Sequence, residues 1–179
     1  AKAAMESGVA HKKIEDLREY AYLLEERLGN SAAFMKSLRD RLQNTVKKKK
    51  RKMKVAFSAG YNARVLEAVN ILKEESLIEP ILLGNRETIY KKMDKLSLPN
   101  LKSVEIITPE LSPHYAGFCE KFYIERQRKG VNESYAKELM EQENYFGSML
   151  VKEGIVDALI AGPSFNYPEC FTPLMQVIG

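Results

Sequence analysis

The chain has 179 residues, of which 45% are hydrophobic and 29% charged, and its formal net charge is +4. This is the composition of an ordinary globular protein, and the length predicts one domain, or one domain with an appendage. Much of the positive charge lies in a single run, so the overall balance excludes no class of partner.

Cysteine and histidine are few and scattered. Cys119 and Cys170 have no metal-ligand or redox spacing, and His11 and His114 lie far apart in the sequence. We therefore expect reduced thiols and no bound metal. No apolar stretch approaches the roughly 20 residues of a membrane span, and the first ten residues lack the form of a signal peptide. These observations predict a cytoplasmic protein with no membrane partner.

Two amphipathic helices are predicted in the first fifty residues. Apolar residues recur at spacings of three and four from Ile14 to Leu28 and again from Phe34 to Val46. Gly29 ends the first helix and Ser31 caps the second, so the pair forms an αα-hairpin. Two short helices bury too little surface to be stable alone. The hairpin is therefore expected to pack on a neighbouring domain or on another subunit.

A basic run, KKKKRKMK from Lys47 to Lys54, follows the hairpin. Such a run could bind a nucleic acid, because clustered Lys and Arg displace counterions from phosphates. The alternative is a solvated helix end and linker, since Lys complements the dipole in a last helical turn and no aromatic residues are interleaved for base stacking. We favour the linker and expect no nucleic-acid partner.

From Lys54 onward, short apolar strands alternate with amphipathic helices. This alternation predicts right-handed βαβ units, and hence an α/β fold with a parallel sheet and helices on both faces. Helix caps are expected at Asn62, Asn85 and Asn132, and the helix after Asn132 is expected to continue through Leu150. The expected strands are KVAFSAG, PILLG, VEIIT and VDALIAG.

In an open α/β sheet, ligands bind where the carboxyl ends of strands meet helix N-termini. The loop after the first strand, SAGYNAR, has no Walker lysine and no dinucleotide-binding glycine pattern. The last loop and its helix, from Asp157 to Gly179, contain no Lys, Arg or His, so they are poorly suited to bind a phosphate. They offer Ser164, Asn166 and Tyr167 as neutral hydrogen-bonding groups.

Several ordered blocks resemble the phosphate acetyl/butyryltransferase family. They are KVAFSAGYNARVLEAVNILKEESLIEPILLGN, FYIERQRKGV and the segment from VDALIAG to QVIG, and they span Lys54 to Gly179. The opening AKAAMESGVA, the hairpin, NYFGSMLVKEG and YPECFTPLMQVIG are similar to bacterial NADP-dependent malic enzymes, in which a malic domain is fused to a phosphotransacetylase-like domain. This resemblance implies a malic-domain tail over residues 1–10, a helical hairpin connector with its basic linker over residues 11–53, and the first half of an incomplete phosphotransacetylase-like domain over residues 54–179.

The resemblance also implies which site residues remain. Two arginines serve the substrate site in active members of the family; one matches Arg126, whereas the other position is occupied by Thr172. The acidic segment after the first strand of active members is matched by Ser58–Asn62, which contains no acid. The residues credited with catalysis fall beyond Gly179. We therefore expect Arg126, Thr172 and the three neutral residues of the last loop to bind a ligand, with no catalytic or metal-binding residue in this chain.

These differences predict a domain that senses a ligand rather than reacting with it. A transferase for acetyl phosphate must stabilise a doubly charged leaving phosphate, and losing one preorganised cation typically costs about 3 kcal/mol, or a hundredfold in rate. The resemblance then implies a regulatory domain that binds acetyl-CoA or a related acyl-CoA, within an enzyme that oxidatively decarboxylates malate to pyruvate. Its partners would be the malic enzyme domain of the same chain and further copies in a homo-oligomer, while NADP and Mg or Mn belong to the parent enzyme.

Two alternatives to a regulatory domain stay open. One is an active phosphate acetyltransferase whose remaining residues lie in the other half of the domain. The other is a structural oligomerisation module driven by the αα-hairpin.

Overall fold

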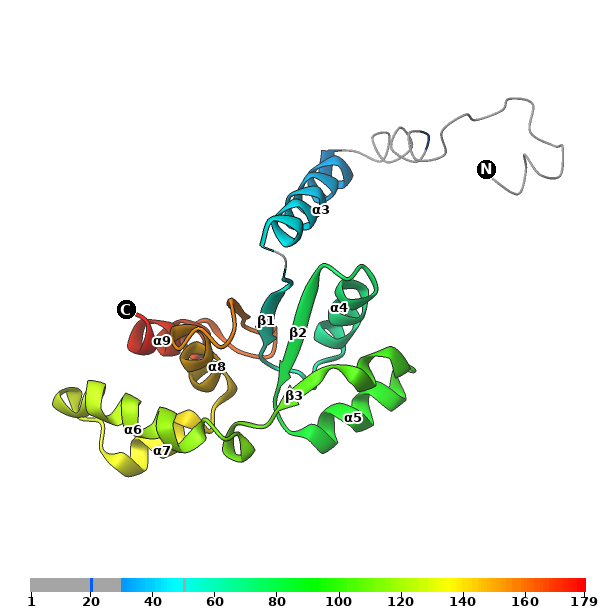
Figure 1. Cartoon of the computed structure of the whole chain (residues 1–179). Helices are drawn as coiled ribbons and strands as arrows, with labels where there is room; N and C mark the ends of the chain where they lie inside the picture. The colour runs from blue at the N-terminus through cyan, green and yellow to red at the C-terminus, as the bar shows by residue number, and fades with distance from the viewer. Residues whose placement is uncertain (1–19, 21–29, 50) are drawn as a thin grey trace, which may run out of the picture. The chain divides into compact units, whose positions relative to one another are not determined.

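A computed structural model describes residue 20 and residues 30–49 and 51–179 (Figure 1). The chain divides between Lys50 and Arg51 into two units, each of which is described by itself. In the first unit, helix α3 spans Asn30–Lys49, which confirms the second helix of the predicted hairpin. Apart from Tyr20, the first predicted helix over residues 14–28 and the predicted tail over residues 1–10 lie outside the described residues. Among the helices of the described ranges, none is both long and apolar enough to cross a membrane.

The second unit, all of which is described, is built on a four-stranded sheet with the order β3-β2-β1-β4 (Figure 1). Every neighbouring pair is parallel, and Ala56 in the middle of β1 pairs with Ile81 on one side and with Leu159 on the other. The predicted parallel sheet is confirmed. Its strands are β1 Met53–Phe57, β2 Ile78–Leu83, β3 Glu105–Ile107 and β4 Ala158–Ile160.

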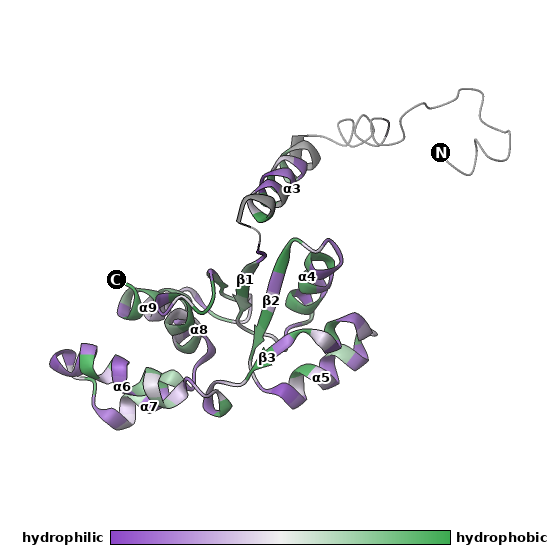
Figure 2. Ribbon diagram, in the orientation of Figure 1, coloured by the Kyte–Doolittle hydropathy of each residue, from purple (hydrophilic) through white to green (hydrophobic). Residues whose placement is uncertain are grey.

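Helices cover both faces of the sheet, as predicted, and each face has its own hydrophobic core. Because β2 lies inside a parallel sheet and is covered on both faces, it is apolar along most of its length (Figure 2). The helices over one face are α4 Ala63–Glu74 and α5 Arg86–Lys95. Those over the other face are α6 Tyr115–Arg126, α7 Glu133–Met140, α8 Glu143–Lys152 and α9 Tyr167–Val177. Short 3-10 turns join them, η1 Pro99–Ser103, η2 Pro109–Leu111 and η3 Gln127–Lys129.

Asparagine side chains begin the helices as predicted. The Oδ1 atom of Asn62 accepts a hydrogen bond from a main-chain N–H at the start of α4 (2.9 Å). Asn85 does the same for α5 (3.0 Å) and Asn132 for α7 (2.8 Å). Each cap satisfies an N–H group that has no partner within its helix.

The single helix predicted from Asn132 through Leu150 is wrong, because the structure contains two helices there. α7 ends at Met140 and α8 begins at Glu143, with Gln142 in an extended conformation between them. α7 buries one apolar face, whereas every α8 residue from Asn144 to Leu150 is buried. The break lets the chain turn from a surface helix into one that packs between the sheet and its neighbours.

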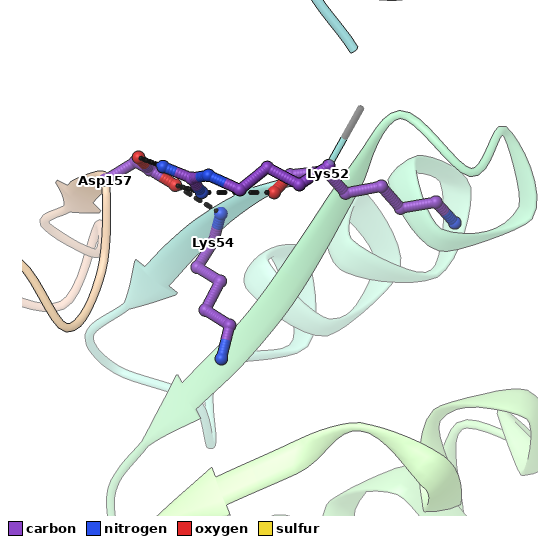
Figure 3. A network of polar contacts seen from close by, with 4 residues as sticks. Lys52, Lys54 and Asp157 are labelled. Atoms are coloured by element: carbon purple, nitrogen blue, oxygen red, sulfur yellow. Dashed lines mark hydrogen bonds and ion pairs between the residues drawn. The ribbon is translucent and has the colours of Figure 1, made fainter. Parts of the chain in front are cut away.

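The basic run is divided between both units. Lys47–Lys49 form the end of α3. Arg51 makes a bidentate ion pair with Asp157, with both N–O distances at 2.7 Å, and the main-chain N–H of Lys54 donates to the same carboxylate at 2.9 Å (Figure 3). Strand β1 begins at Met53. The end of the run therefore joins the start of β1 to the residue before β4.

Candidate functional site

The strand order creates a switch point between β1 and β4. From β1 the chain winds outward to β2 and β3, and it then places β4 on the other side of β1. The helices that follow these two strands, α4 and α9, contribute to the cores on opposite faces of the sheet. Open α/β sheets bind ligands where loops diverge from adjacent strand ends in this way. We call residues 58–62 and 161–166 the switch-point loops.

The switch-point loops are bonded to each other and packed tightly. The main-chain N–H of Gly162 donates to the buried hydroxyl of Ser58 at 2.8 Å. The side-chain amide of Asn62 donates to the hydroxyl of Ser164 at 2.9 Å. A Cβ atom added at Gly162 would lie 2.5 Å from the Cβ of Ala59 and 2.7 Å from the carbonyl oxygen of Ser58. Only glycine fits at this contact.

Three of the five predicted ligand-binding residues lie on or just after the second switch-point loop, and a fourth lies further along α9. Ser164 is exposed and is joined to the other loop through Asn62. Asn166 is the N-cap of α9 and forms a capping box with Glu169, so its Oδ1 is already engaged. Tyr167 is 73% exposed and stacks on another aromatic ring of α9, and Thr172 is exposed further along the same helix.

The fifth predicted residue, Arg126, lies near the other end of α9. Its Nε atom is buried and has no hydrogen-bond partner among the described residues. Burial raises the pKa of Tyr145, and the positive charge of Arg126 partly opposes this increase. The Tyr145 hydroxyl donates to Gln176, in the last turn of α9, at 2.9 Å. Because a helix of this length extends about 16 Å, a ligand that contacts both Arg126 and Ser164 would have to be elongated.

Two successive residues at the start of α8 contact the two sides of the switch point. The carboxylate of Glu143 accepts a hydrogen bond from the main-chain N–H of Ala59 in the first loop. The buried side-chain amide of Asn144 donates to the carbonyl oxygen of Glu169, in the first turn of α9, at 2.9 Å. Neither residue is among those predicted from the sequence to form the site. An acidic residue in a first helical turn is favoured by the helix dipole in any case, so an acid at this position does not by itself indicate a distant contact.

Glu143 is the strongly perturbed acid of this region. Burial raises its pKa to about 7; the Ala59 N–H opposes this increase, and the negative charge of Glu110 adds to it. A Cβ atom added at Gly84 would lie 2.7 Å from the Oε1 of Glu143. The carboxyl group is thus enclosed by the loops that follow β1 and β2.

The site combines neutral hydrogen-bonding groups with one enclosed carboxyl group. From Asp157 to Gly179 the sequence supplies no cation. In the described ranges, no group of three or more His, Cys, Asp and Glu side chains is placed to hold a metal ion. The arrangement can bind and orient a ligand, but these loops contain no preorganised positive charge for a leaving phosphate.

Comparison with known proteins gives one family and two kinds of relative. The sequence profile of the Phosphate acetyl/butaryl transferase family matches residues 37–179. The NADP-dependent malic enzyme of Escherichia coli strain K12 is 32% identical over 182 aligned residues, which cover all of this chain and 23% of that protein. The NAD-dependent malic enzyme of Rhizobium meliloti strain 1021 is 31% identical over the same span.

The second kind of relative is shorter. The phosphate acetyltransferase of Bacillus subtilis strain 168 is 32% identical over 126 residues, covering 70% of this chain and 38% of that protein. Among solved structures, the EutD phosphotransacetylase from Staphylococcus aureus matches with a TM-score of 0.66 and 30% identity, over 78% of this chain and 42% of that one. The chain therefore spans about a quarter of the malic enzymes and about two fifths of the phosphotransacetylases that it matches.

Proposed function

The chain belongs to the Phosphate acetyl/butaryl transferase family, and from this premise we propose that it is the acetyl-CoA-sensing, regulatory part of an NADP-dependent malic enzyme. It contains a phosphotransacetylase-like domain, of the kind found in malic enzymes and in phosphate acetyltransferases.

The range of residues covered by each kind of match supports the proposal that the chain is part of a malic enzyme. The family profile begins at residue 37, whereas the match to the malic enzymes also includes the residues before it. Those residues hold the predicted tail, the first helix of the predicted hairpin and the start of its second helix. Because the malic-enzyme relatives are named for NADP or for NAD, both coenzymes belong in the assay.

The chemistry of the switch-point loops supports sensing over catalysis. Ser164 and Asn62 are neutral, Asn166 is engaged as a helix cap, and the acid beside them is Glu143. A carboxylate disfavours the build-up of negative charge on a leaving phosphate. An acyl-CoA that binds without reacting can still regulate, provided that it has different affinities for two global states of the enzyme.

The exposed face of α9 supports a further packing partner. Five large apolar side chains on this helix and its C-cap are exposed at helical spacing: Tyr167, Phe171, Leu174, Met175 and Ile178. We propose that the remainder of the phosphotransacetylase-like domain covers this face in the complete protein, which acts as a homo-oligomer.

The test uses the full-length protein that carries this chain. We expect calorimetry to show acetyl-CoA binding, and malate-dependent reduction of NADP or of NAD, assayed separately, to change on addition of acetyl-CoA. We expect no formation of acetyl-CoA from acetyl phosphate and CoA. Turnover of acetyl phosphate would contradict the proposal and select the active transferase. Absence of acetyl-CoA binding, with self-association retained on sedimentation, would select the structural module.

Arg126→Ala is predicted to weaken acetyl-CoA binding about tenfold, the loss of roughly 1.4 kcal/mol expected for one charged contact. The half-buried guanidinium has a hydrogen-bonding atom without a partner among the described residues, so a bound anion would satisfy it. Calorimetry on the full-length protein measures the affinity. Arg128→Ala is the matched control, because Arg128 is exposed two residues later. Equal losses for both variants would mean that Arg126 has no specific role.

A further inference from the structure

The start of α8 lies behind the switch-point loops and holds them from the protein interior. Glu143 binds the main chain at Ala59, and Asn144 binds the first turn of α9. Glu143 is separated from Ala59 by 84 residues in sequence, so this contact exists only in the folded chain. Neither residue is among those predicted to touch the ligand.

Ala59 needs such support because its backbone is unusual. It is fully buried and has φ of +54°, in the left-handed region that residues with a Cβ atom seldom adopt. Its N–H is held by Glu143, and its carbonyl oxygen accepts from the N–H of Asn62 at 2.8 Å. The Asn62 side chain then reaches Ser164, and the Ala59 Cβ lies against Gly162. These contacts connect the Ala59 N–H to both loops.

The surroundings of Glu143 make its charge depend on pH near neutrality. The loop after β1 donates the Ala59 N–H to it, and the loop after β2 lies against it at Gly84, where an added Cβ would be 2.7 Å from its Oε1. The charged group that acts on it from η2 is Glu110, which is also an acid. Burial and this like charge favour the protonated form, and the pKa of about 7 places the change near neutral pH.

We propose that Glu143 is the positioning residue of the switch-point loops, and that loss or gain of its proton changes the conformation at Ala59 and through it the contact between the loops. A carboxylate ion accepts the Ala59 N–H strongly, whereas the neutral acid accepts it more weakly. The consequence of this change for ligand affinity rests on the proposed function. If the switch-point loops bind an acidic ligand, protonation of Glu143 removes a negative charge that would repel it.

The inference is tested without ligand by NMR. In the 179-residue chain, we expect the amide signals of Ala59 and Gly162 to shift with pH in one step centred near pH 7. In Glu143→Gln, which keeps an acceptor oxygen but cannot ionise, the step should be lost. In Glu110→Gln, the midpoint should move to lower pH, because the negative charge of Glu110 no longer raises the pKa of Glu143. Glu138→Gln, an equal charge change on the exposed side of α7, should behave like the wild type.

The outcome is decided by the amide signals alone. Their failure to titrate, or an unchanged step in Glu143→Gln, would overturn the inference. A second measurement extends it to the ligand: acetyl-CoA should bind the full-length protein about threefold or more tightly at pH 6 than at pH 8. Glu143→Gln should lose this difference, after the same correction for titration of the ligand's own phosphates. Absence of acetyl-CoA binding at both pH values would contradict the proposed function, while the NMR result would still decide the role of Glu143.

Discussion

Replacing Gly162 by alanine is expected to lower the free energy of unfolding by about 2–3 kcal/mol, at the upper end of the range for overpacked sites. The added Cβ would lie 2.5 Å from the Cβ of Ala59 and 2.7 Å from the carbonyl oxygen of Ser58. Neither atom belongs to the end of a flexible side chain, so the backbone of one loop has to move. Urea denaturation followed by circular dichroism measures the loss.

The same substitution should also separate the two switch-point loops. Movement at Gly162 removes its hydrogen bond to Ser58, which is 2.8 Å long, and draws Ser164 away from Asn62. We therefore expect weaker acetyl-CoA binding by the full-length variant, in addition to the lower stability.

Gly117→Ala is the matched control for this prediction. Gly117 lies within α6, and no atom would lie within 4 Å of an added Cβ. Alanine in a helix interior is more favourable than glycine by roughly 0.5–1 kcal/mol, so this variant should be slightly more stable than the wild type. If both variants were equally stable, the close contact between the switch-point loops would be refuted.

The position of the candidate site follows from local patterns in the sequence. The apolar strands at residues 54–60 and 156–162 and the helices after them are each read from a few neighbouring residues. A parallel sheet then brings the carboxyl ends of the strands to one edge. The structure confirms this arrangement and joins Asn62 to Ser164 across it.

What holds the site could not be read from the sequence, because it depends on contacts between distant residues. Glu143 has the appearance of an ordinary acid in a first helical turn, and only the break between α7 and α8 turns it toward Ala59. Asn166 differs from the prediction in the other direction. The sequence predicts that its side chain binds a ligand, whereas in the structure this side chain caps α9 in a capping box with Glu169.

The separation of Arg126 from the other predicted residues has the same origin. Sequence order places it at the end of one helix and Ser164 before another, without fixing the distance between them. Packing of α6 and α8 sets Arg126 near the last turn of α9, through Tyr145 and Gln176.

The stability of the chain is expected to depend on pH through Glu143. Its pKa in the folded protein is about 7, chiefly because it is partly buried, against an ordinary value of 4.5. The folded state therefore binds more protons than the unfolded state between these values, and the free energy of unfolding falls as the pH rises through this interval. One pKa unit corresponds to about 1.4 kcal/mol, so the contribution of Glu143 to the fall is about 3 kcal/mol and is complete above pH 7.

Glu143→Gln isolates this contribution, because glutamine has nearly the same shape and no titratable proton. The difference in unfolding free energy between the variant and the wild type should be constant below about pH 4.5. It should then shift in favour of the variant by about 3 kcal/mol between pH 5 and pH 8. Burying the glutamine amide has a cost that does not depend on pH. This cost shifts the curve of the difference against pH up or down without changing its slope.

Urea denaturation at half-unit pH intervals, with Glu138→Gln as the exposed control, measures the difference in unfolding free energy. Parallel curves for the wild type and Glu143→Gln would show that the buried carboxyl group is already ionised at pH 5, and that the enclosure by Ala59, Gly84 and Glu110 does not hold its proton.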